Sequence, residues 1–336
     1  MRKVLVTGGA GFIASNFLQY MVNKYPNYYF VCLDSLTYAG NYNNLKSIKN
    51  KINFKFVKGD ITDIELVDNL FRKEQFNWII NFAAESHVDN SIKNPNIFLI
   101  TNIIGTQVLM DACIKYGIER YHQVSTDEVY GDLPLDNPNL LFNENSPLNP
   151  SNPYSASKAS ADMLIHAYHR TYGLPITITR CSNNYGPYQF PEKLIPLTIY
   201  KALNNESIPL YGKGENIRDW IHVYDHVVGL DIILHHGKIG ETYNIGGHSE
   251  ITNLEVVKTV LEYLGKPLSL ITYIEDRPGH DLRYALDTTK IEKEFGWSIK
   301  YTFEYGIKET IDWYLNNMDW IESIKNGEYR TTYKND

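Results

Sequence analysis

A tyrosine and a lysine four positions apart, Tyr154 and Lys158, have the residue types and the spacing of an acid–base pair. Residues four apart share one face of a helix, so we expect the Lys158 ammonium to lower the pKa of the phenol below its usual value of about 10. Such a phenol takes a proton from a substrate hydroxyl near neutral pH, while the lysine contacts a nicotinamide ribose. The pair therefore predicts chemistry at a hydroxyl group.

Chance produces other pairs with this spacing, because the chain has 26 tyrosines. The same spacing occurs at two other places, Tyr20 with Lys24 and Tyr42 with Lys46. Only Tyr154 begins a long predicted helix downstream of a predicted strand that ends in STDEVYG at residues 125–131. Ligands bind at the carboxyl ends of strands in open α/β sheets, so this context selects Tyr154 and Lys158.

A glycine-rich turn, TGGAGFIA at residues 7–14, follows the first predicted strand and opens a helix. Gly8 and Gly11 let backbone N–H groups approach a pyrophosphate at the positive end of that helix. Asp34 ends the second predicted strand, where a carboxylate accepts hydrogen bonds from an adenosine ribose and repels the extra phosphate of NADP. The pattern favours NAD. An ordinary tight turn at the glycines and a turn cap at Asp34 are the structural alternatives.

The elements that must position these groups alternate along the chain. Six β-rich apolar runs are separated by segments long enough for crossover helices, and they cover residues 4–6, 29–33, 54–57, 78–82, 121–124 and 176–179. Two intervening helices are long, at residues 96–116 and 154–172. The alternation predicts an α/β fold with a Rossmann-type doubly wound parallel sheet.

A second, smaller domain is expected because the alternation weakens after about residue 185, where Pro and Gly become more frequent. We expect residues 1–184, together with a helix and strand at about 221–247, to form the NAD-binding domain. Residues of about 185–220 and 248–336 are expected to form a smaller α/β substrate-binding domain.

The composition argues against several classes of protein. The chain has 336 residues, a net charge of -7 and 43% hydrophobic residues, as expected of a folded soluble protein. Its acidic balance counts against nucleic acid as a partner, and no apolar stretch approaches the 18 or so residues that a membrane span needs. Three scattered cysteines, Cys32, Cys113 and Cys181, encode neither a disulfide framework nor a metal site and indicate a reducing cytoplasm.

Six motifs together make the chain similar to a known family. From Met1 to about Trp297 it resembles the extended short-chain dehydrogenases/reductases that act on nucleotide sugars, and most closely the dTDP-glucose 4,6-dehydratases. The motifs are TGGAGFI at residues 7–13, AAESHVD at 83–89, STDEVYG at 125–131, NPYSASK at 152–158, NNYGPYQFPEKL at 183–194 and DRPGHD at 276–281. Two positions depart from the family pattern, Ala14 in place of glycine and Asn90 in place of arginine.

The resemblance implies a reaction and a role for each catalytic residue. Tyr154 takes the proton of the sugar O4 while C4 hydride moves to NAD, and Thr126 helps to polarise that oxygen. The 4-ketone acidifies C5–H, so Glu128 removes the C5 proton and Asp127 protonates the leaving C6 hydroxyl. The hydride then returns to C6, which gives a 4-keto-6-deoxy sugar, water and unchanged NAD. A solvated charged turn is the structural alternative for the two carboxylates.

The resemblance also implies the binding residues. The cofactor contacts are expected from Gly8, Gly11, Phe12, Ile13, Asp34, Ser35, Thr37, Asp60, Ile61, Ala83, Ala84, Thr101, Tyr154, Lys158 and Asn184. The contacts to a nucleotide-diphosphate sugar are expected from Ser86, Thr126, Asn183, Lys193, Leu194, Pro209, Tyr211, Arg218, Asn253, Asp276, Arg277, Pro278, Gly279 and His280. Three scarce cations are suited to bind the diphosphate: Lys193, Arg218 and Arg277. Taken alone, each is more simply explained as a surface charge. Asp60 also reads as a simple turn cap.

Rival activities share parts of this pattern. A UDP-glucose 4,6-dehydratase stays open, because one methyl on the base contributes only about 1 kcal/mol of discrimination. A nucleotide-sugar 4-epimerase needs no acid–base pair at C5 and C6, and a sugar-nucleotide decarboxylase or GDP-mannose dehydratase can share Glu128 but not Asp127 with DRPGHD. A catalytically dead NAD-sensing regulator would have lost Tyr154, Lys158 and the carboxylates. The pathway served, rhamnose or another deoxysugar, stays open too.

The two long helices carry more apolar residues than one sheet-facing stripe requires. Examples are Ile100, Ile104, Val108, Met163 and Ala167. The family pairs such helices into a four-helix interface, so we expect a homodimer.

Overall fold

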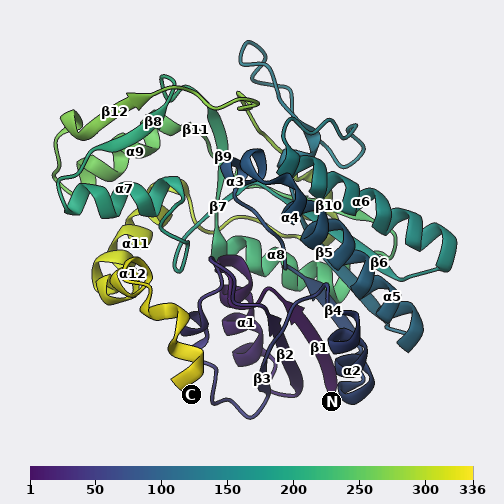
Figure 1. Cartoon of the computed structure of the whole chain (residues 1–336). Coiled ribbons are helices and arrows are strands. Elements are labelled where there is room, and N and C mark those ends of the chain that lie inside the picture. Colours follow the sequence, from purple (N-terminus) through teal and green to yellow (C-terminus); the bar gives the residue numbers. More distant parts are fainter. Residues whose placement is uncertain (336) are drawn as a thin grey trace.

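The computed structural model describes residues 1–335 and has one large sheet at its centre (Figure 1). All seven strands are parallel, in the order β10-β6-β5-β4-β1-β2-β3. Their bounds are β1 Arg2–Thr7, β2 Tyr28–Asp34, β3 Phe54–Lys58, β4 Trp78–Asn81, β5 Arg120–Thr126, β6 Ile176–Cys181 and β10 Thr242–Ile245. The six strands predicted from the apolar runs are confirmed, within two residues at each end.

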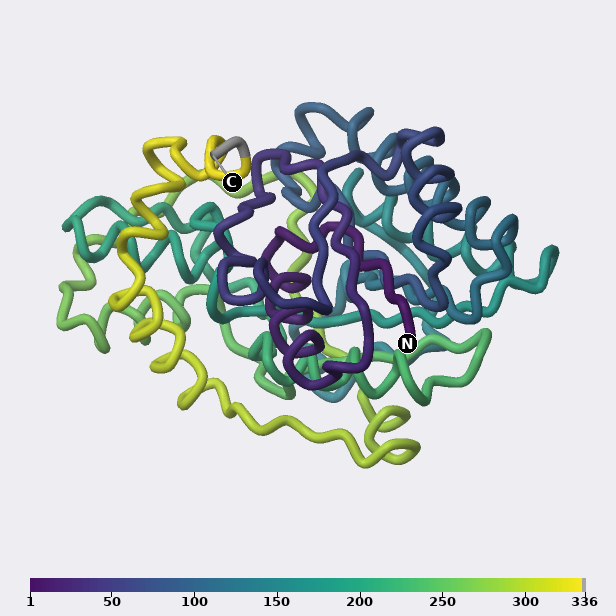
Figure 2. The backbone as a smooth tube through the Cα atoms, turned by 90° about the horizontal axis from the view of Figure 1, so that it is seen from below, coloured from purple at the N-terminus to yellow at the C-terminus, as the bar shows by residue number. Residues whose placement is uncertain are grey.

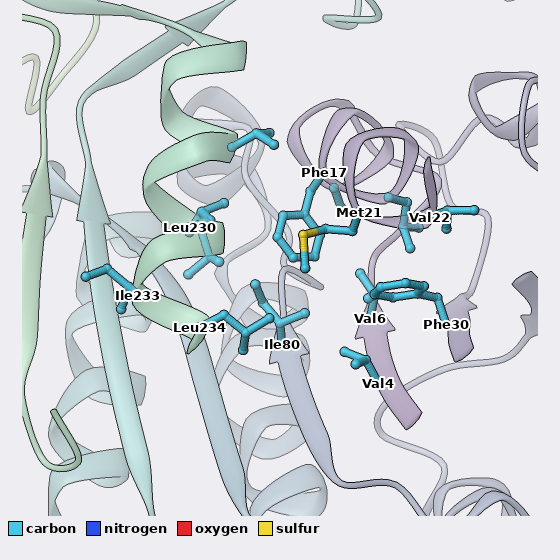
Figure 3. Packing of buried hydrophobic residues seen from close by; sticks show 14 of the residues in the cluster. Val4, Val6, Phe17, Met21, Val22, Phe30, Ile80, Leu230, Ile233 and Leu234 are labelled. Carbon is cyan, nitrogen blue, oxygen red and sulfur yellow. The ribbon is translucent and has the colours of Figure 1, made fainter. Parts of the chain in front are cut away.

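Helices cover both faces of this sheet. Successive residues of a strand point to opposite sides, so both faces carry apolar side chains that the helices bury. On one face α1 (Phe12–Lys24) and α8 (Val223–His236) bury Phe17 and Leu230 against Val4 and Val6 (Figure 3). On the other face α2 (Ile64–Glu74), α5 (Thr106–Tyr116) and α6 (Pro153–Tyr172) pack on alternate strand residues such as Leu5. The structure is therefore the doubly wound α/β fold that the sequence predicts.

The helix predicted at residues 96–116 is confirmed, with an internal irregularity. It runs through α4 (Pro95–Leu99), a π-helical stretch η2 (Ile100–Gly105) and α5 without a break. The helix predicted at 154–172 is α6, which begins one residue earlier and ends at Gly173 with a positive φ of 71°.

The expectation that no stretch approaches the length of a membrane span is wrong for the first of these helices. Pro95–Tyr116 spans 22 residues with a mean hydropathy of 1.7 over its best window, which is long and apolar enough to cross a membrane. Uncharged polar residues such as Thr101 and Asn102 interrupt the apolar run without adding a charge. Half of the window is buried, and Leu109 and Met110 lie in the core beneath the sheet, as in the core helix of a soluble protein.

The remaining strands form two small sheets beside the large one. One has the order β11-β9-β7 and the other pairs β12 with β8. Their bounds are β7 Asn183–Tyr185, β8 Ile208–Tyr211, β9 Ile217–His222, β11 Glu250–Thr252 and β12 Ile271–Ile274. Strand β10 returns to the large sheet, next to β6. The division of the chain into two domains at the stated residues stays a prediction.

Shorter and peripheral helices complete the chain. They are α3 Val88–Lys93, α7 Leu194–Leu203, α9 Asn253–Tyr263, α10 Thr289–Phe295, α11 Phe303–Asn316, α12 Met318–Lys325, and the 3₁₀ turns η1 Tyr42–Leu45, η3 Asp127–Tyr130, η4 Leu268–Leu270, η5 Glu328–Arg330 and η6 Thr332–Asn335. The view from below shows that the end of the chain runs back to the purple N-terminal segment (Figure 2).

Candidate active site

A cavity of about 450 Å³ lies where the strands of the large sheet end. Every residue predicted to contact the cofactor lines it, and so do all five predicted catalytic residues. Of the predicted substrate residues, Ser86, Thr126, Asn183 and Lys193 also line it. The structure thus brings the glycine turn and the Tyr154–Lys158 pair into one cavity.

The glycine turn lets the cavity wall approach very closely. Gly8 has a φ of +67°, and a Cβ atom there would lie 2.8 Å from the backbone of Ala83. Gly11 is the N-cap of α1, and no side chain caps that helix end. Free N–H groups and the positive end of the helix dipole therefore face the cavity, which fits a pyrophosphate.

Asp34 both stabilises the neighbouring turns through hydrogen bonds and lines the cavity. Its carboxylate accepts hydrogen bonds from the N–H groups of Ala10, at 2.9 Å, and Leu36, at 2.7 Å. Burial raises its pKa, against the lowering effect of these two bonds. The turn-cap interpretation is therefore correct, and the same side chain lines the cavity at the end of β2 where a ribose would lie. Asp60 likewise accepts a bond from the Thr62 N–H, at 2.9 Å, while lining the cavity.

The Tyr154–Lys158 pair is set by a well-capped helix. Asn152 and Ser155 form a capping box, and Pro153 occupies the first turn of α6. Tyr154 is 9% exposed and Lys158 is 4% exposed. The Lys158 ammonium donates a hydrogen bond to the Val124 carbonyl at 2.9 Å.

The expectation that Lys158 lowers the pKa of the phenol is wrong for this structure. Burial raises the pKa of Tyr154 well above its ordinary value, and the negative charge of Glu128 raises it further. The ammonium is engaged with Val124, and its own pKa is lowered by burial. A buried phenol beside carboxylates keeps its proton until positive charge approaches it.

The two carboxylates follow directly from the end of β5. Thr126 caps η3 by accepting a hydrogen bond from the Glu128 N–H, and its hydroxyl lies 3.2 Å from Asp127 Oδ1. Asp127 is only 2% exposed, and its Oδ2 atom has no hydrogen-bond partner among residues 1–335. Burial raises the pKa of both carboxyl groups, and the neighbouring Glu128 charge raises that of Asp127 further. The raised pKa values favour the protonated form of both carboxyl groups, and the charge of Glu128 favours it further at Asp127.

Three predicted substrate cations converge on Glu128. The charges of Arg277, Arg218 and Lys193 all lower its pKa, against the larger effect of burial. Arg218 is held by the Asp281 carbonyl at 2.9 Å and lies over the Tyr284 ring at 4.5 Å.

The other two cations are held by the loop after β4 and by the first turn of α3. Lys193 donates to the Ser86 carbonyl at 3.2 Å, and Arg277 pairs with Asp89 at 3.3 Å. Arg277 Nε is buried without a partner in the described part of the chain. That free donor and the three positive charges suit an anionic ligand.

Ten predicted substrate residues do not line the cavity. They are Leu194, Pro209, Tyr211, Arg218, Asn253, Asp276, Arg277, Pro278, Gly279 and His280. Several form a group around Asp89, whose carboxylate accepts a bond from the Tyr211 hydroxyl at 2.9 Å. His280 pairs with Asp276 at 2.6 Å, and its ring lies 6.0 Å from that of Tyr211. Their contacts with a substrate stay predictions.

Sequence reasoning missed several cavity residues. Glu85, Glu192 and Phe190 line it, and all three stand inside motifs that were recognised without being assigned a role. Asn184 has a further partner, because His226 Nδ1 lies 2.9 Å from its Oδ1 atom. No spacing in the sequence connects His226 with the cavity, since α8 is reached only through the fold.

The two departures from the family pattern lie in different surroundings. Ala14 is buried in the first turn of α1 and belongs to the cavity lining. Asn90 is exposed on α3, where its N–H donates to His87 Nδ1 at 3.3 Å.

The chain is similar to known nucleotide-sugar dehydratases in sequence and in structure. The family model described as GDP-mannose 4,6 dehydratase matches residues 5–310. A dTDP-glucose 4,6-dehydratase of Xanthomonas campestris pv. campestris (strain B100) is 49% identical, with 98% of this chain and 98% of that protein covered. The crystal structure of dTDP-glucose 4,6-dehydratase from Bacillus anthracis str. Ames in complex with NAD has a TM-score of 0.89 and 50% identity, covering 96% of this chain and 100% of that one. DesIV, the dTDP-glucose 4,6-dehydratase of Streptomyces venezuelae with NAD and TYD bound, has a TM-score of 0.92 and 46% identity, covering 96% and 99%.

Proposed function

The chain belongs to the GDP-mannose 4,6 dehydratase family, and from that premise we propose that it is a dTDP-glucose 4,6-dehydratase that uses NAD catalytically. The product is dTDP-4-keto-6-deoxyglucose, with water released. One observation carries the proposal: a single cavity holds the Tyr154–Lys158 pair, the Asp127–Glu128 pair and the glycine turn.

The residues at the carboxyl edge of the sheet would hold the cofactor. Gly8 and Gly11 would accommodate its pyrophosphate, and Asp34 its adenosine ribose. When bound, NAD supplies hydride acceptance from C4 of the sugar and hydride donation to C6. Lys158 lies one helical turn after Tyr154 and would anchor the nicotinamide ribose.

Tyr154 begins the reaction by taking the proton from the sugar O4. Burial holds the pKa of the phenol high, so this step requires positive charge beside the ring, from the oxidised cofactor or from Lys158 once it turns from Val124. Thr126, whose hydroxyl lies beside the acidic pair, would polarise O4. The C4–H and O4–H bonds break, and a ketone forms at C4.

The ketone makes the C5 proton acidic, and the acidic pair then removes water. Glu128 accepts the C5 proton, while Asp127 donates its proton to the C6 hydroxyl as the C6–O bond breaks. The raised pKa of Asp127 favours the protonated form that this step requires. C5 regains a proton when hydride returns to C6, so atoms and electrons balance to one water per sugar. The reaction class is that of a hydro-lyase.

Lys193, Arg218 and Arg277 would meet the diphosphate of the substrate. Each already acts electrostatically on Glu128, and the guanidinium groups can bind phosphate oxygens with two hydrogen bonds. A 4-epimerase would need the same cofactor and Tyr154, but it has no use for a buried acid next to a carboxylate, so Asp127 favours dehydration.

The proposal is tested by supplying dTDP-glucose and UDP-glucose separately, without added NAD, and identifying the product by mass and by its 4-ketone. We expect conversion of dTDP-glucose to the 4-keto-6-deoxy sugar over many turnovers, with no free NADH. A 4-epimer as product, or NADH accumulating in step with product, would contradict the proposal.

A homodimer is also proposed, through the two long helices. Ile100, Ile104 and Met163 are 51%, 47% and 66% exposed. Val108, which the sequence placed on this face, is instead buried against the sheet. Light scattering at micromolar concentration should give twice the mass of the chain, and a monomeric mass would contradict the prediction. The three cysteines are free and buried, consistent with the proposed cytoplasmic location.

A further inference from the structure

The C-terminal segment of the described chain leaves the small sheets and returns to the N-terminal half. It comprises α12, η5 and the start of η6, and we call residues 318–333 the strap. In Figures 1 and 2 the yellow end of the chain lies beside the purple segment that follows β2. That purple segment, residues 35–45, forms one wall of the cavity through Ser35, Thr37, Ala39 and Gly40.

Hydrogen bonds attach the strap to this first wall. The Tyr329 hydroxyl donates to the Tyr38 carbonyl at 2.6 Å, and Trp320 Nε1 donates to Asn44 Oδ1 at 2.8 Å. Tyr329 itself is only 4% exposed. The strap therefore holds the wall at two residues, Tyr38 and Asn44.

Two further contacts continue along the same wall. The Asn43 amide donates to the Thr332 hydroxyl at 3.3 Å. The Tyr333 ring packs against the Tyr42 ring, with ring centres 5.2 Å apart. The strap thus contacts Tyr38 and residues 42–44 of this wall.

The C-terminal helices also hold the opposite wall. Gln189 and Phe190 line the cavity, and Tyr314 of α11 donates to the Gln189 carbonyl at 2.6 Å. Trp320 of the strap lies 6.0 Å from the ring of Tyr188.

Tyr329 lies where the two walls meet. The Phe190 ring is 6.1 Å from that of Tyr329 and 5.9 Å from that of Tyr38, which belongs to the first wall. The strap is therefore continuous across the boundary between the walls.

Both walls contain a strained residue. Leu36 has a φ of 54° and Tyr188 a φ of 69°, in the left-handed region that side chains other than glycine disfavour. Such conformations persist only where the surroundings fix them. Tyr188 packs on Trp313 and Trp320, and the segment that follows Leu36 is bonded to the strap.

We propose that the strap fastens the two walls over the cofactor and sets how slowly NAD leaves the cavity, with Tyr329 and Trp320 as positioning residues. This goes beyond the proposed function and rests on it only in taking NAD as the occupant. Residues of the strap lie outside the cavity lining, so their effect is on retention of the cofactor and not on proton transfer.

The test measures exchange of bound radiolabelled NAD against unlabelled NAD in the full-length protein, without substrate. Tyr329→Phe keeps the ring but removes the hydroxyl, and with it the bond to the Tyr38 carbonyl and the bond that Arg330 Nε donates at 3.1 Å. It should speed exchange about three- to ten-fold. Asn43→Ala removes the bond to Thr332 from the side of the wall and should speed exchange by a smaller factor. Tyr263→Phe is the matched control, because it loses an exposed hydroxyl bond to Asp312 and should exchange at the wild-type rate.

Wild-type exchange rates in both Tyr329→Phe and Asn43→Ala would overturn the proposal. If a variant is poorly folded, the proposal is tested instead by amide hydrogen exchange of residues 36–45 in the NAD-bound protein. These amides should exchange faster in Asn43→Ala than in Tyr263→Phe. Equal rates in the two variants would overturn the proposal. The outcome is separable from the proposed reaction. Suppose that the wild type fails to dehydrate dTDP-glucose while Tyr329→Phe exchanges NAD faster than the wild type. The proposed reaction would then be refuted, and the proposal for the strap would stand.

Discussion

The two ends of the cavity, proposed to bind the cofactor and the sugar, are built by different means. The cofactor end, around Gly8, Gly11 and Asp34, works through backbone: a positive φ, a close approach to Ala83 and an uncapped helix N-terminus. The sugar end, around Asp127, Glu128 and Tyr154, works through buried ionisable side chains whose pKa values are all raised.

This difference separates binding from chemistry. A backbone cradle binds the constant part of a cofactor at little electrostatic cost, whereas buried acids are unfavourable for folding and useful for proton transfer. Changes at the cofactor end should therefore alter NAD retention and stability. Changes at the sugar end should alter rate and pH dependence while NAD stays bound.

The largest effect is expected at the sugar end. Tyr154→Phe removes the proposed base for the O4 proton, and kcat should fall by about 10²- to 10⁴-fold with NAD content unchanged. Tyr168→Phe is the matched control on the same helix, because its hydroxyl bonds to Asp111 outside the cavity lining, and its kcat should match the wild type. A Tyr154→Phe variant with normal kcat would place the base elsewhere.

The cofactor end should respond to a single methyl group. Gly8→Ala brings a Cβ to 2.8 Å from the Ala83 backbone at a φ of +67°, so NAD affinity should fall about 10- to 100-fold and the melting temperature should fall as well. Gly117→Ala has the same φ with open space around it, so it should cost only about 1 kcal/mol of stability and leave NAD content intact. Equal NAD retention in the two variants would remove the argument for a backbone cradle.

Substrate affinity should depend on the arginines that act on Glu128. Arg218→Lys and Arg277→Lys keep the charge and lose the paired donors, so each should raise KM for dTDP-glucose about ten-fold with a smaller change in kcat. NAD content should be unaffected, and Arg72→Lys on α2 serves as a surface control. Loss of NAD from Arg218→Lys with normal substrate affinity would show that this arginine belongs to the cofactor end.

The smallest expected effect is a gain in stability. Because the folded-state pKa of Asp127 is raised, the wild type loses stability as pH rises above the unfolded value of about 4. Asp127→Asn removes that loss, so its free energy of unfolding at pH 7 should be about 1 kcal/mol higher than that of the wild type. Below pH 4 the two proteins should have the same free energy of unfolding. Urea unfolding at several pH values measures this, and a variant less stable than the wild type at pH 7 would contradict it.

The pH profile of kcat tests the same pair. Activity should fall on the acidic side as Glu128 takes up a proton and on the basic side as Asp127 loses one. Both raised pKa values shift this window upward from that of ordinary carboxyl groups.

The sequence alone predicts most of the scaffold and the cofactor end, for a physical reason. Strands such as β1 and the turn at Gly8 are short local patterns whose residues are contiguous, so apolar runs and glycines reveal them. The length of α6 follows similarly from its proline start and its glycine end.

The sugar end is harder to predict from the sequence, because its residues come from distant segments of the chain. Arg218 and Arg277 meet near Glu128 only through the fold, and the resemblance to a family was needed to group them. The raised pKa of Tyr154 depends on burial and neighbouring carboxylates, which the four-residue spacing to Lys158 does not encode. The strap could not be predicted either, because Tyr329 and Tyr38 are 291 residues apart in the chain.

The central claim is that one cavity first oxidises the sugar at C4 and then uses Glu128 to remove the C5 proton. The most direct test mixes Glu128→Gln, loaded with NAD, with dTDP-glucose in deuterated water. Absorbance of reduced cofactor should rise on the enzyme and persist, while C5 takes up no deuterium. Normal deuterium incorporation at C5 in this variant would contradict the account, because another residue would then be the base.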